Sequence, residues 1–355
     1  MSVNGKSGYW HHTDFEHVRE SHDHANLQTQ TASQIKNLET YFYIMSAHTE
    51  LAILRAQFQQ KILENATPLN LTAIWPSTLH FTELTAQLSD LKACLDSFRP
   101  LSANEVFKLK QAFDIEYTYQ SNKIEGNTLS KNETHLVVNK GFTVKGKTLA
   151  EHLEAVNHQE AIDYIREVAA SELHFDKRCL LDIHALILHG INRENAGRYR
   201  LEDVLISGSS FVPPSFLHIP DLMNQYFDFY NENKDVMHPV ELAAEMHERL
   251  VTIHPFIDGN GRTARLVMNL ILLRNGYPIT ILDSENDKRL AYYDSLEWAQ
   301  TGHDPNKMQF KLFIANNVKH WLFVYLNLLA PNGNADAQHK GYYFFNRIKT
   351  LIQPS

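Results

Sequence analysis

The chain has 355 residues, of which 43% are hydrophobic and 21% are charged, and its formal net charge is −8 at pH 7. This composition is typical of a folded soluble protein with two or three domains, or with one large domain and extensions. The negative charge argues against general nucleic-acid binding, and we expect no nucleic-acid partner.

The sequence indicates neither membrane insertion nor an oxidising compartment. Its longest apolar runs are too short to cross a bilayer, and the N-terminal residues lack the apolar stretch of a signal peptide. The two cysteines, Cys94 and Cys179, lie far apart and indicate no disulfide framework. We therefore expect a cytoplasmic protein without a membrane partner.

Helical periodicity dominates the first hundred residues. Apolar side chains three and four apart run over residues 25–64, and a further amphipathic segment covers residues 81–98. The histidine-rich stretch HHTDFEHVRESHDH fits no standard metal-binding spacing, and we interpret it as a solvated segment. We predict that residues 1–100 form an N-terminal helical region with a structural or target-selecting role.

Two Ser-x-x-Glu sequences, at residues 102–105 and 130–133, are capping boxes that predict helix starts. The first helix should cover about residues 103–125. The second should be short, because GFTVKGK interrupts its pattern at Gly141. Further helices are expected over residues 150–170 and 177–190.

The segment GRYRLEDVLISGSSFVPP differs from the helical sequence around it. Val204, Leu205 and Ile206 are separated from the apolar pair at 211–212 by Ser-Gly-Ser-Ser, which predicts a small β-hairpin. Helical patterns resume near Pro220 and continue from Pro239. We therefore predict a mostly α fold with one hairpin.

Three regions follow from these patterns. A helical bundle should occupy residues 101–330, with the N-terminal extension before it. The last residues, 331–355, should form a tail that ends in the amphipathic piece YYFFNRIKTLI.

The stretch HPFIDGNGRTAR, from His254 to Arg265, is not required by core packing. Pro255 disfavours helical geometry in the residue before it, so His254 should lie at a helix end. Gly259, Asn260 and Gly261 permit a backbone that points several N–H groups into one concavity at the start of the next helix. This arrangement predicts an anion site.

The charged residues of the same stretch suit a polyphosphate. Arg262 and Arg265 lie three apart, on neighbouring faces of one helical turn. Asp258 offers a hard oxygen ligand for the Mg²⁺ that accompanies nucleotide phosphates. His254 has an ordinary pKa that allows it to accept a proton near neutral pH. Together these residues predict phosphoryl or nucleotidyl transfer.

Two other interpretations of this stretch stay open. It can be a glycine-rich helix cap with arginines paired to nearby carboxylates. Alternatively, His254 and Asp258 can be metal ligands of a hydrolase, joined by His184 and His189, although Pro255 argues against the continuous helix this needs.

A second motif, QSNKIEGNTLS, places Ser121 and Glu125 on one face of a helix end, before Gly126. A glutamate in a last turn faces the negative end of the helix dipole, which costs about 0.3–1 kcal/mol. Such a residue is favoured where a cation lies opposite it. The arginines of the predicted phosphate site are suitable cations.

The first motif resembles the Fic family signature HxFx(D/E)GNGRxxR at every specified position, and the resemblance extends over about residues 105–323. It implies a Fic-type helical bundle with a β-hairpin flap. It also implies an enzyme that uses ATP and Mg²⁺ to transfer AMP to a Ser, Thr or Tyr hydroxyl of a target protein. Self-modification and homo-oligomer formation are left open, as is the nucleotide, because some Fic enzymes use UTP, GTP or CDP-choline.

The resemblance implies a role for each motif position. His254 resembles the general base, Asp258 the Mg²⁺ ligand, and Phe256 the residue that anchors the loop. The implied nucleotide and phosphate contacts are Gly259, Asn260, Gly261, Arg262, Arg265, Tyr292 and Tyr293. The hairpin at Val204, Leu205 and Ile206 resembles the flap that receives the target segment by strand addition.

QSNKIEG resembles the family's inhibitory pattern (S/T)xxxE(G/N), in the class whose inhibitory helix precedes the Fic core. The resemblance implies that Glu125 pairs with Arg265 and obstructs the γ-phosphate. It also permits a reversed role, in which Glu125 positions a water that removes AMP from a modified protein. From a different class, a nucleotide-binding regulatory module without turnover remains an alternative.

Overall fold

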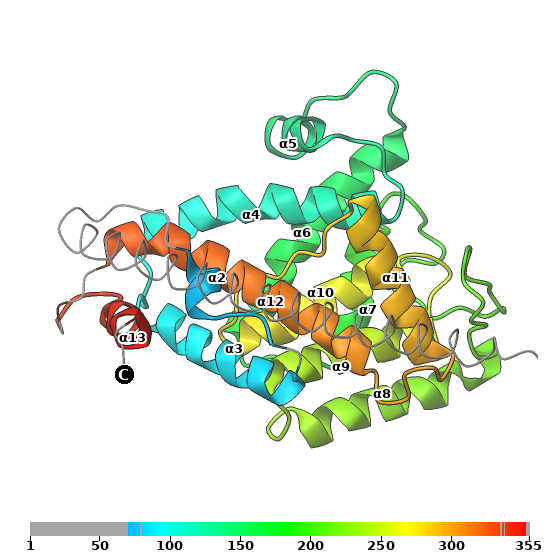
Figure 1. Cartoon of the computed structure of the whole chain (residues 1–355). Coiled ribbons are helices and arrows are strands. Elements are labelled where there is room, and N and C mark those ends of the chain that lie inside the picture. The colour runs from blue at the N-terminus through cyan, green and yellow to red at the C-terminus, as the bar shows by residue number, and fades with distance from the viewer. Residues whose placement is uncertain (1–69, 79, 334–335, 337, 353–355) are drawn as a thin grey trace, which may run out of the picture. The chain divides into compact units, whose positions relative to one another are not determined.

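The computed structural model describes residues 70–78, 80–333, 336 and 338–352. These residues belong to one compact unit, Gln60–Ser355, and they form twelve α-helices without a β-strand (Figure 1). The helices are α2 (Leu71–Ile74), α3 (Phe81–Asp96), α4 (Ala103–Ile124), α5 (Lys131–Lys140), α6 (Leu149–Ala170), α7 (Lys177–Ile187), α8 (Ile219–Asn233), α9 (Pro239–Ile253), α10 (Asn260–Arg274), α11 (Asn286–Gln300), α12 (Met308–Leu329) and α13 (Tyr342–Ile352).

Helix α10 is the central element of this bundle (Figure 1). It packs against α9, α6, α7 and α4, and its residues from Ala264 to Leu272 are all buried. A helix that buries every face in this way belongs to the core rather than to the surface. The first turn of α10 carries the GNGR sequence, so the core itself holds the predicted anion site in place.

The predicted starts of α4 and α5 are confirmed. Ser102 and Glu105 form a capping box at α4, and a second box opens α5 at Ser130. Helix α5 ends at Gly141, whose left-handed φ of 65° suits glycine. Helix α4 ends at Ile124, which leaves Glu125 as its C-cap.

The predicted β-hairpin at Val204, Leu205 and Ile206 is wrong. The described backbone there is irregular, with a turn in which the Ser209 N–H donates to the Ile206 carbonyl at 3.3 Å. The side chain of Leu205 is 79% exposed, so no neighbouring layer covers an apolar hairpin face. An isolated two-stranded hairpin is marginal in water, and the prolines at 213–214 remove ladder donors from the second arm.

Side-chain contacts hold this loop instead of a strand ladder. The buried guanidinium of Arg200 donates to the carbonyl oxygens of His254, Glu202 and Pro214. Ser210 donates from both its amide and its hydroxyl to Glu297 on α11. The loop is therefore joined to the backbone of His254 and to α11.

The N-terminal and C-terminal described helices pack together. Helix α3, predicted at residues 81–98, lies against α12 and α13, and the ring of Phe98 contacts those of Phe344 and Phe345. None of the described helices is long and apolar enough to cross a membrane. The predicted helix over 25–64 and the histidine-rich stretch lie outside the described residues, and the division at 1–100, 101–330 and 331–355 stays a prediction.

Candidate active site

His254 follows the last residue of α9 and adopts a left-handed backbone, with φ 51° and ψ 57°. Pro255 after it excludes a further helical turn. The Nδ1 atom lies 3.1 Å from the Val251 carbonyl oxygen, and because a carbonyl oxygen only accepts, Nδ1 carries the proton and Nε2 is left as the acceptor. Burial lowers the pKa of His254 below its ordinary value of 6.5, against the raising effect of its bond to Val251. The ring is therefore neutral at pH 7 and can accept a proton.

The loop after His254 is anchored by Phe256, which is fully buried and stacks on His184 of α7 at 3.6 Å between ring centroids. His184 accepts from the Gly197 N–H through Nδ1 at 3.0 Å, so its Nε2 donates to the Asp258 carbonyl at 2.9 Å. Burial lowers the pKa of His184 to about 4. The neutral imidazole of His184 thus holds the loop through its stack on Phe256 and its bond to the Asp258 carbonyl.

Asn260 closes the same loop. Its amide nitrogen donates to the Phe256 carbonyl at 2.9 Å, and its amide oxygen accepts from the Phe256 N–H at 3.0 Å. The side chain is only 3% exposed. In this structure the Asn260 side chain shapes the anion site, and its contribution to phosphate binding would come through its backbone N–H.

The anion site itself is the N-terminus of α10. Gly259 is the N-cap, with φ 79° and no side-chain capping bond, and the first backbone bond of the helix runs from Thr263 N–H to the Gly259 carbonyl. The amides of residues 260–262 therefore lie before the first internal hydrogen bond, at the positive end of the dipole. This geometry favours phosphate binding.

Arg262 joins the loop to α6. Its guanidinium is 3% exposed and donates to Glu154 at 3.0 Å and to Asp258 at 3.2 Å. The Asp258 side chain is 56% exposed, so its oxygens are open to solvent beside the α10 amides. Glu154 was not predicted, because nothing in the local sequence relates α6 to a residue more than a hundred positions away.

Arg265 is the most enclosed charge of the site, with 1% exposure. Its Nε donates to the Ser121 hydroxyl at 3.0 Å, and its terminal nitrogen donates to the Ser121 carbonyl at 2.9 Å and to Glu125 at 2.6 Å. Burial opposes the charged form, but the carboxylate of Glu125 outweighs it and the pKa of Arg265 is raised. The structure thus brings together the two sequence motifs, at the contact the inhibitory pattern implied.

Gly261 allows this contact. A Cβ atom at Gly261 would lie 2.3 Å from the Glu125 carboxylate oxygen, so that oxygen occupies the space above the first turn of α10. Glu125 caps the C-terminal end of α4, where a negative charge is unfavourable, and it lies at the N-terminal end of α10, where one is favourable. The carboxylate oxygen therefore lies beside the first turn of α10, next to the amides described above.

The two candidate adenine contacts differ in environment. Tyr292 is 2% exposed, and its hydroxyl lies 3.1 Å from Nε2 of the buried His247, which makes it a core residue. Tyr293 is 41% exposed, and its hydroxyl donates to the Ile124 carbonyl at 3.1 Å. Tyr293 is therefore the one of the pair that lies at the surface, next to the end of α4.

A hydrolase metal centre finds no support in the described part of the chain. No group of three or more His, Cys, Asp or Glu side chains there could hold an ion, and both ring nitrogens of His184 are used by backbone groups. A single exposed carboxylate beside an amide nest instead suits Mg²⁺ that is held mainly by phosphates. Asp258 fits that role.

Comparison with known proteins agrees with this geometry. Residues 174–272 match the model of the Fic/DOC family. The chain is 35% identical over 222 residues to the protein adenylyltransferase Fic of Nematostella vectensis. This alignment covers 61% of this chain and 50% of that protein. This chain is a homologue of the Fic adenylyltransferases. A second Fic adenylyltransferase, from Culex quinquefasciatus, is 35% identical over 242 residues, with 68% of this chain and 47% of that protein covered.

Solved structures of Fic proteins have the same fold. Fic-1 of C. elegans, residues 134–508, is similar with a TM-score of 0.61 and 29% identity, over 69% of this chain and 71% of that one. A Fic domain-containing signaling protein of Bacteroides thetaiotaomicron gives a TM-score of 0.60 and 29% identity, over 71% of this chain and 97% of that one. This Fic homologue spans about half the length of the curated relatives it matches. The matched family region contains His254 to Arg265, whereas Ser121 and Glu125 precede it.

Proposed function

We propose that this Fic homologue transfers AMP from ATP to a Ser, Thr or Tyr hydroxyl of a target protein and is autoinhibited by Glu125. One observation carries the proposal. The carboxylate of Glu125 lies 2.6 Å from the guanidinium of Arg265 and over the Gly261 backbone, beside the α10 amides that we propose bind a phosphate. The site thus suits an anion, and in this structure the anion next to Arg265 is the carboxylate of Glu125.

In the proposed reaction, Nε2 of His254 takes the proton of the target hydroxyl. The hydroxyl oxygen then bonds to the α-phosphorus of ATP, the bond from that phosphorus to the pyrophosphate oxygen breaks, and pyrophosphate leaves. The α10 amides and Arg262 hold the phosphates, and Arg265 pairs with the γ-phosphate. Mg²⁺ held by Asp258 and the phosphates would neutralise charge on the leaving group.

Autoinhibition follows from competition for one guanidinium. While Glu125 holds Arg265, the γ-phosphate meets a carboxylate in place of its partner cation. A bias of about 2.7 kcal/mol towards this closed pairing reduces transfer about a hundredfold. Ser121 contributes by fixing two of the guanidinium nitrogens through its hydroxyl and carbonyl.

The loop at residues 203–212 is the proposed docking segment for the target. Leu205 and Val212 are 79% and 65% exposed, and the structure shows no hydrogen bond from the backbone of Val204 or Leu205 to any other described residue. An extended target segment could pair with these free backbone groups. The bond from Arg200 to the His254 carbonyl would then bring the target close to the base.

The test is mass spectrometry of the purified chain after incubation with ATP and Mg²⁺. We expect a gain of one AMP in Glu125→Gly, little gain in the wild type, and none in Glu125→Gly with His254→Ala. Equal labelling of wild type and Glu125→Gly would disprove the autoinhibition but keep the transfer. No label in any variant, with UTP and GTP also tried and ATP binding shown separately, would favour a nucleotide-binding module without turnover.

Removal of AMP is a second candidate, because the Glu125 side chain is 33% exposed and only one of its oxygens contacts Arg265 among the described residues. Its other oxygen could orient a water for attack on the phosphorus of an AMP-modified side chain, which would release AMP and restore the hydroxyl. A chain that already carries AMP, incubated with Mg²⁺, should then lose the AMP when wild-type enzyme is added and keep it when the Glu125→Gly variant is added.

A further inference from the structure

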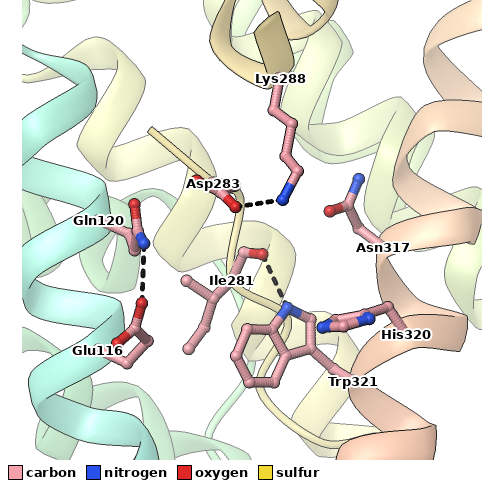
Figure 2. A pocket seen from close by; sticks show the side chains of 8 residues that line it. All are labelled: Glu116, Gln120, Ile281, Asp283, Lys288, Asn317, His320 and Trp321. Carbon is pink, nitrogen blue, oxygen red and sulfur yellow. Dashed lines mark hydrogen bonds and ion pairs between the residues drawn. The ribbon is translucent and has the colours of Figure 1, made fainter. Parts of the chain in front are cut away.

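A cavity of about 320 Å³ lies on the side of α4 that faces α11 and α12 (Figure 2). Gln120 of α4, Asp283 before α11, Lys288 in the first turn of α11, and Asn317, His320 and Trp321 of α12 line it. Its volume is in the lower part of the range of small-molecule sites, about 300–1,000 Å³. None of its lining residues belongs to the HPFIDGNGRTAR loop.

Aromatic side chains define the shape of a ligand for this cavity. Trp321 and His320 line it together, with their rings at 86° and their centroids 5.3 Å apart. The indole is held in place because its N–H donates to the Ile281 carbonyl at 2.8 Å and its ring packs edge-on against Phe113. The held indole and the ring of His320 nearly perpendicular to it offer aromatic surfaces, which suits a planar aromatic ligand.

The polar side chains define its hydrogen bonding. The amide nitrogen of Asn317 donates to the Phe313 carbonyl at 2.8 Å. Among the described residues, the structure shows no hydrogen-bond partner for the amide oxygen of Asn317 or for either ring nitrogen of His320. A ligand with an N–H donor and a neighbouring acceptor would satisfy both groups.

The charges of the cavity walls are already paired. Asp283 and Lys288 form an ion pair of 2.5 Å, and Glu116 on α4 pairs with Lys131 of α5. A charged ligand would have to break one of these pairs, whereas a neutral one would not. The Lys288 side chain is 61% exposed, so this wall of the cavity borders solvent.

We propose that this cavity is a second ligand site, for a small neutral heteroaromatic molecule that carries an amide or amino group. The ring would stack on Trp321, and the polar group would bond to Asn317 and His320. This site is separate from the nucleotide site proposed above.

The site is connected to the inhibitory contact through α4. The side-chain oxygen of Gln120 accepts from the Ser284 amide at 2.8 Å and from its hydroxyl at 2.5 Å, so the wall of the cavity holds the last turns of α4. The next residue, Ser121, bonds to Arg265. A ligand that fits this cavity binds best while Gln120 of α4 is bonded to Ser284. It therefore stabilises the state in which α4 keeps this packing. The consequence for activity, stronger inhibition, rests on the proposed autoinhibition.

The test uses nicotinamide as the probe and Asn317→Leu as the variant. Asn316→Leu is the matched control, because Asn316 makes the same type of bond to its own helix, at 2.9 Å to the Leu312 carbonyl, but is exposed and does not line the cavity. We expect saturable millimolar binding to the wild-type chain by ligand-observed NMR. Asn317→Leu should weaken it about tenfold, as loss of one buried hydrogen bond does, and Asn316→Leu should leave it unchanged. Thermal unfolding of both variants verifies that they fold.

Hydrogen exchange gives a readout that does not involve ATP. At a nicotinamide concentration ten times the Kd, amides in the last turns of α4 should exchange about tenfold more slowly. In the wild type, nicotinamide should also slow AMP transfer, and in Glu125→Gly it should not. Absence of saturable binding, or equal binding by Asn317→Leu and wild type, would overturn the site. Binding and slower exchange without AMP transfer in any variant would contradict the proposed function and leave the site standing.

Discussion

Glu125 and Arg265 are unequal partners in their ion pair. The guanidinium is 1% exposed and makes two further hydrogen bonds, both to Ser121, whereas the carboxylate is 33% exposed and lies at a helix end. The buried partner is held by Ser121 as well as by Glu125, whereas the described hydrogen bonding of the Glu125 carboxylate is with Arg265 alone. At this scale, the proposed switch is one carboxylate, which contacts a buried guanidinium and is itself partly exposed.

The first residue-scale prediction concerns Gly261→Ala. The new methyl group would lie 2.3 Å from the Glu125 oxygen, and since this is the end of a flexible side chain, the carboxylate would move away from Arg265. We expect AMP transfer above the wild-type rate but below that of Glu125→Gly, because the methyl group also narrows the anion site. Initial rates measure this. Adding Gly261→Ala to Glu125→Gly should give no further increase, and an increase would contradict the mechanism.

The second residue-scale prediction concerns pH. A base acts in its unprotonated form, and burial lowers the pKa of His254 below 6.5, so the acid limb of the transfer rate should lie below pH 6.5. The charge of Glu125 raises this pKa, so its removal should move the limb to still lower pH. A pH–rate profile of Glu125→Gly, compared with that of the wild type, checks both statements. An acid limb above pH 6.5 would argue against His254 as the base.

At the scale of elements, the site is a junction between helix ends. The C-terminal end of α4 is held by Tyr293, which donates to Ile124, and by Asn122, which donates to the Glu154 carbonyl of α6. The loop between α9 and α10 is held from behind by His184 of α7. The reactive groups therefore come from the loop between α9 and α10 and from the first turns of α10, and contacts from α4, α6, α7 and α11 hold the elements around them.

His184→Ala tests the support of this loop. The change removes the stack on Phe256 and the bond to the Asp258 carbonyl, and it should lower the free energy of unfolding by about 2–4 kcal/mol. In the Glu125→Gly background it should also reduce AMP transfer, because the Asp258 backbone loses its position. Denaturant unfolding and initial rates measure the two effects. His189→Ala, an exposed histidine nearby, should change neither, and equal effects of both variants would refute the role of His184.

At the scale of the whole described unit, one core continues from the helices around the site to the last helix. Helix α12 packs on α9 and α3, and α13 packs on α3. The Phe113 and Tyr325 rings stack at 4.3 Å between centroids and join α4 to α12. Helix α4 is thus supported by a residue about two hundred positions away in sequence.

Phe344→Ala tests this continuity. Phe344 is fully buried against Phe98, and its loss should cost about 3–5 kcal/mol of unfolding free energy. Tyr343→Ala, at a 43% exposed neighbour, should cost less than half as much. Well below the unfolding midpoint, Phe344→Ala in the Glu125→Gly background should transfer AMP at the parent rate. Chemical denaturation gives the first quantity, and a rate measured at low temperature gives the second.

Local signals predicted much of the fold and the centre of the site. The capping boxes at 102–105 and 130–133 and the stop at Gly141 are confirmed, since these structures form between neighbours in the chain. The hairpin at 204–212 was wrong for the opposite reason. Its strand residues had the right local pattern, but a strand also needs a neighbouring strand to pair with and a layer of side chains that buries its apolar face. Neither is encoded within nine residues.

By itself, the sequence determined which groups of this Fic homologue carry its proposed chemistry, because base, carboxylate, amide nest and arginines fall within twelve neighbouring positions whose backbone is set by Pro255 and the glycines. The tertiary structure decided what those groups contact, and of these contacts only that of Glu125 with Arg265 was implied beforehand, through the family resemblance. Glu125 on Arg265, Glu154 on Arg262 and His184 behind the loop are pairs separated by 140, 108 and 74 residues. Such pairs depend on how helices pack, and packing is a property of the whole core rather than of any local pattern.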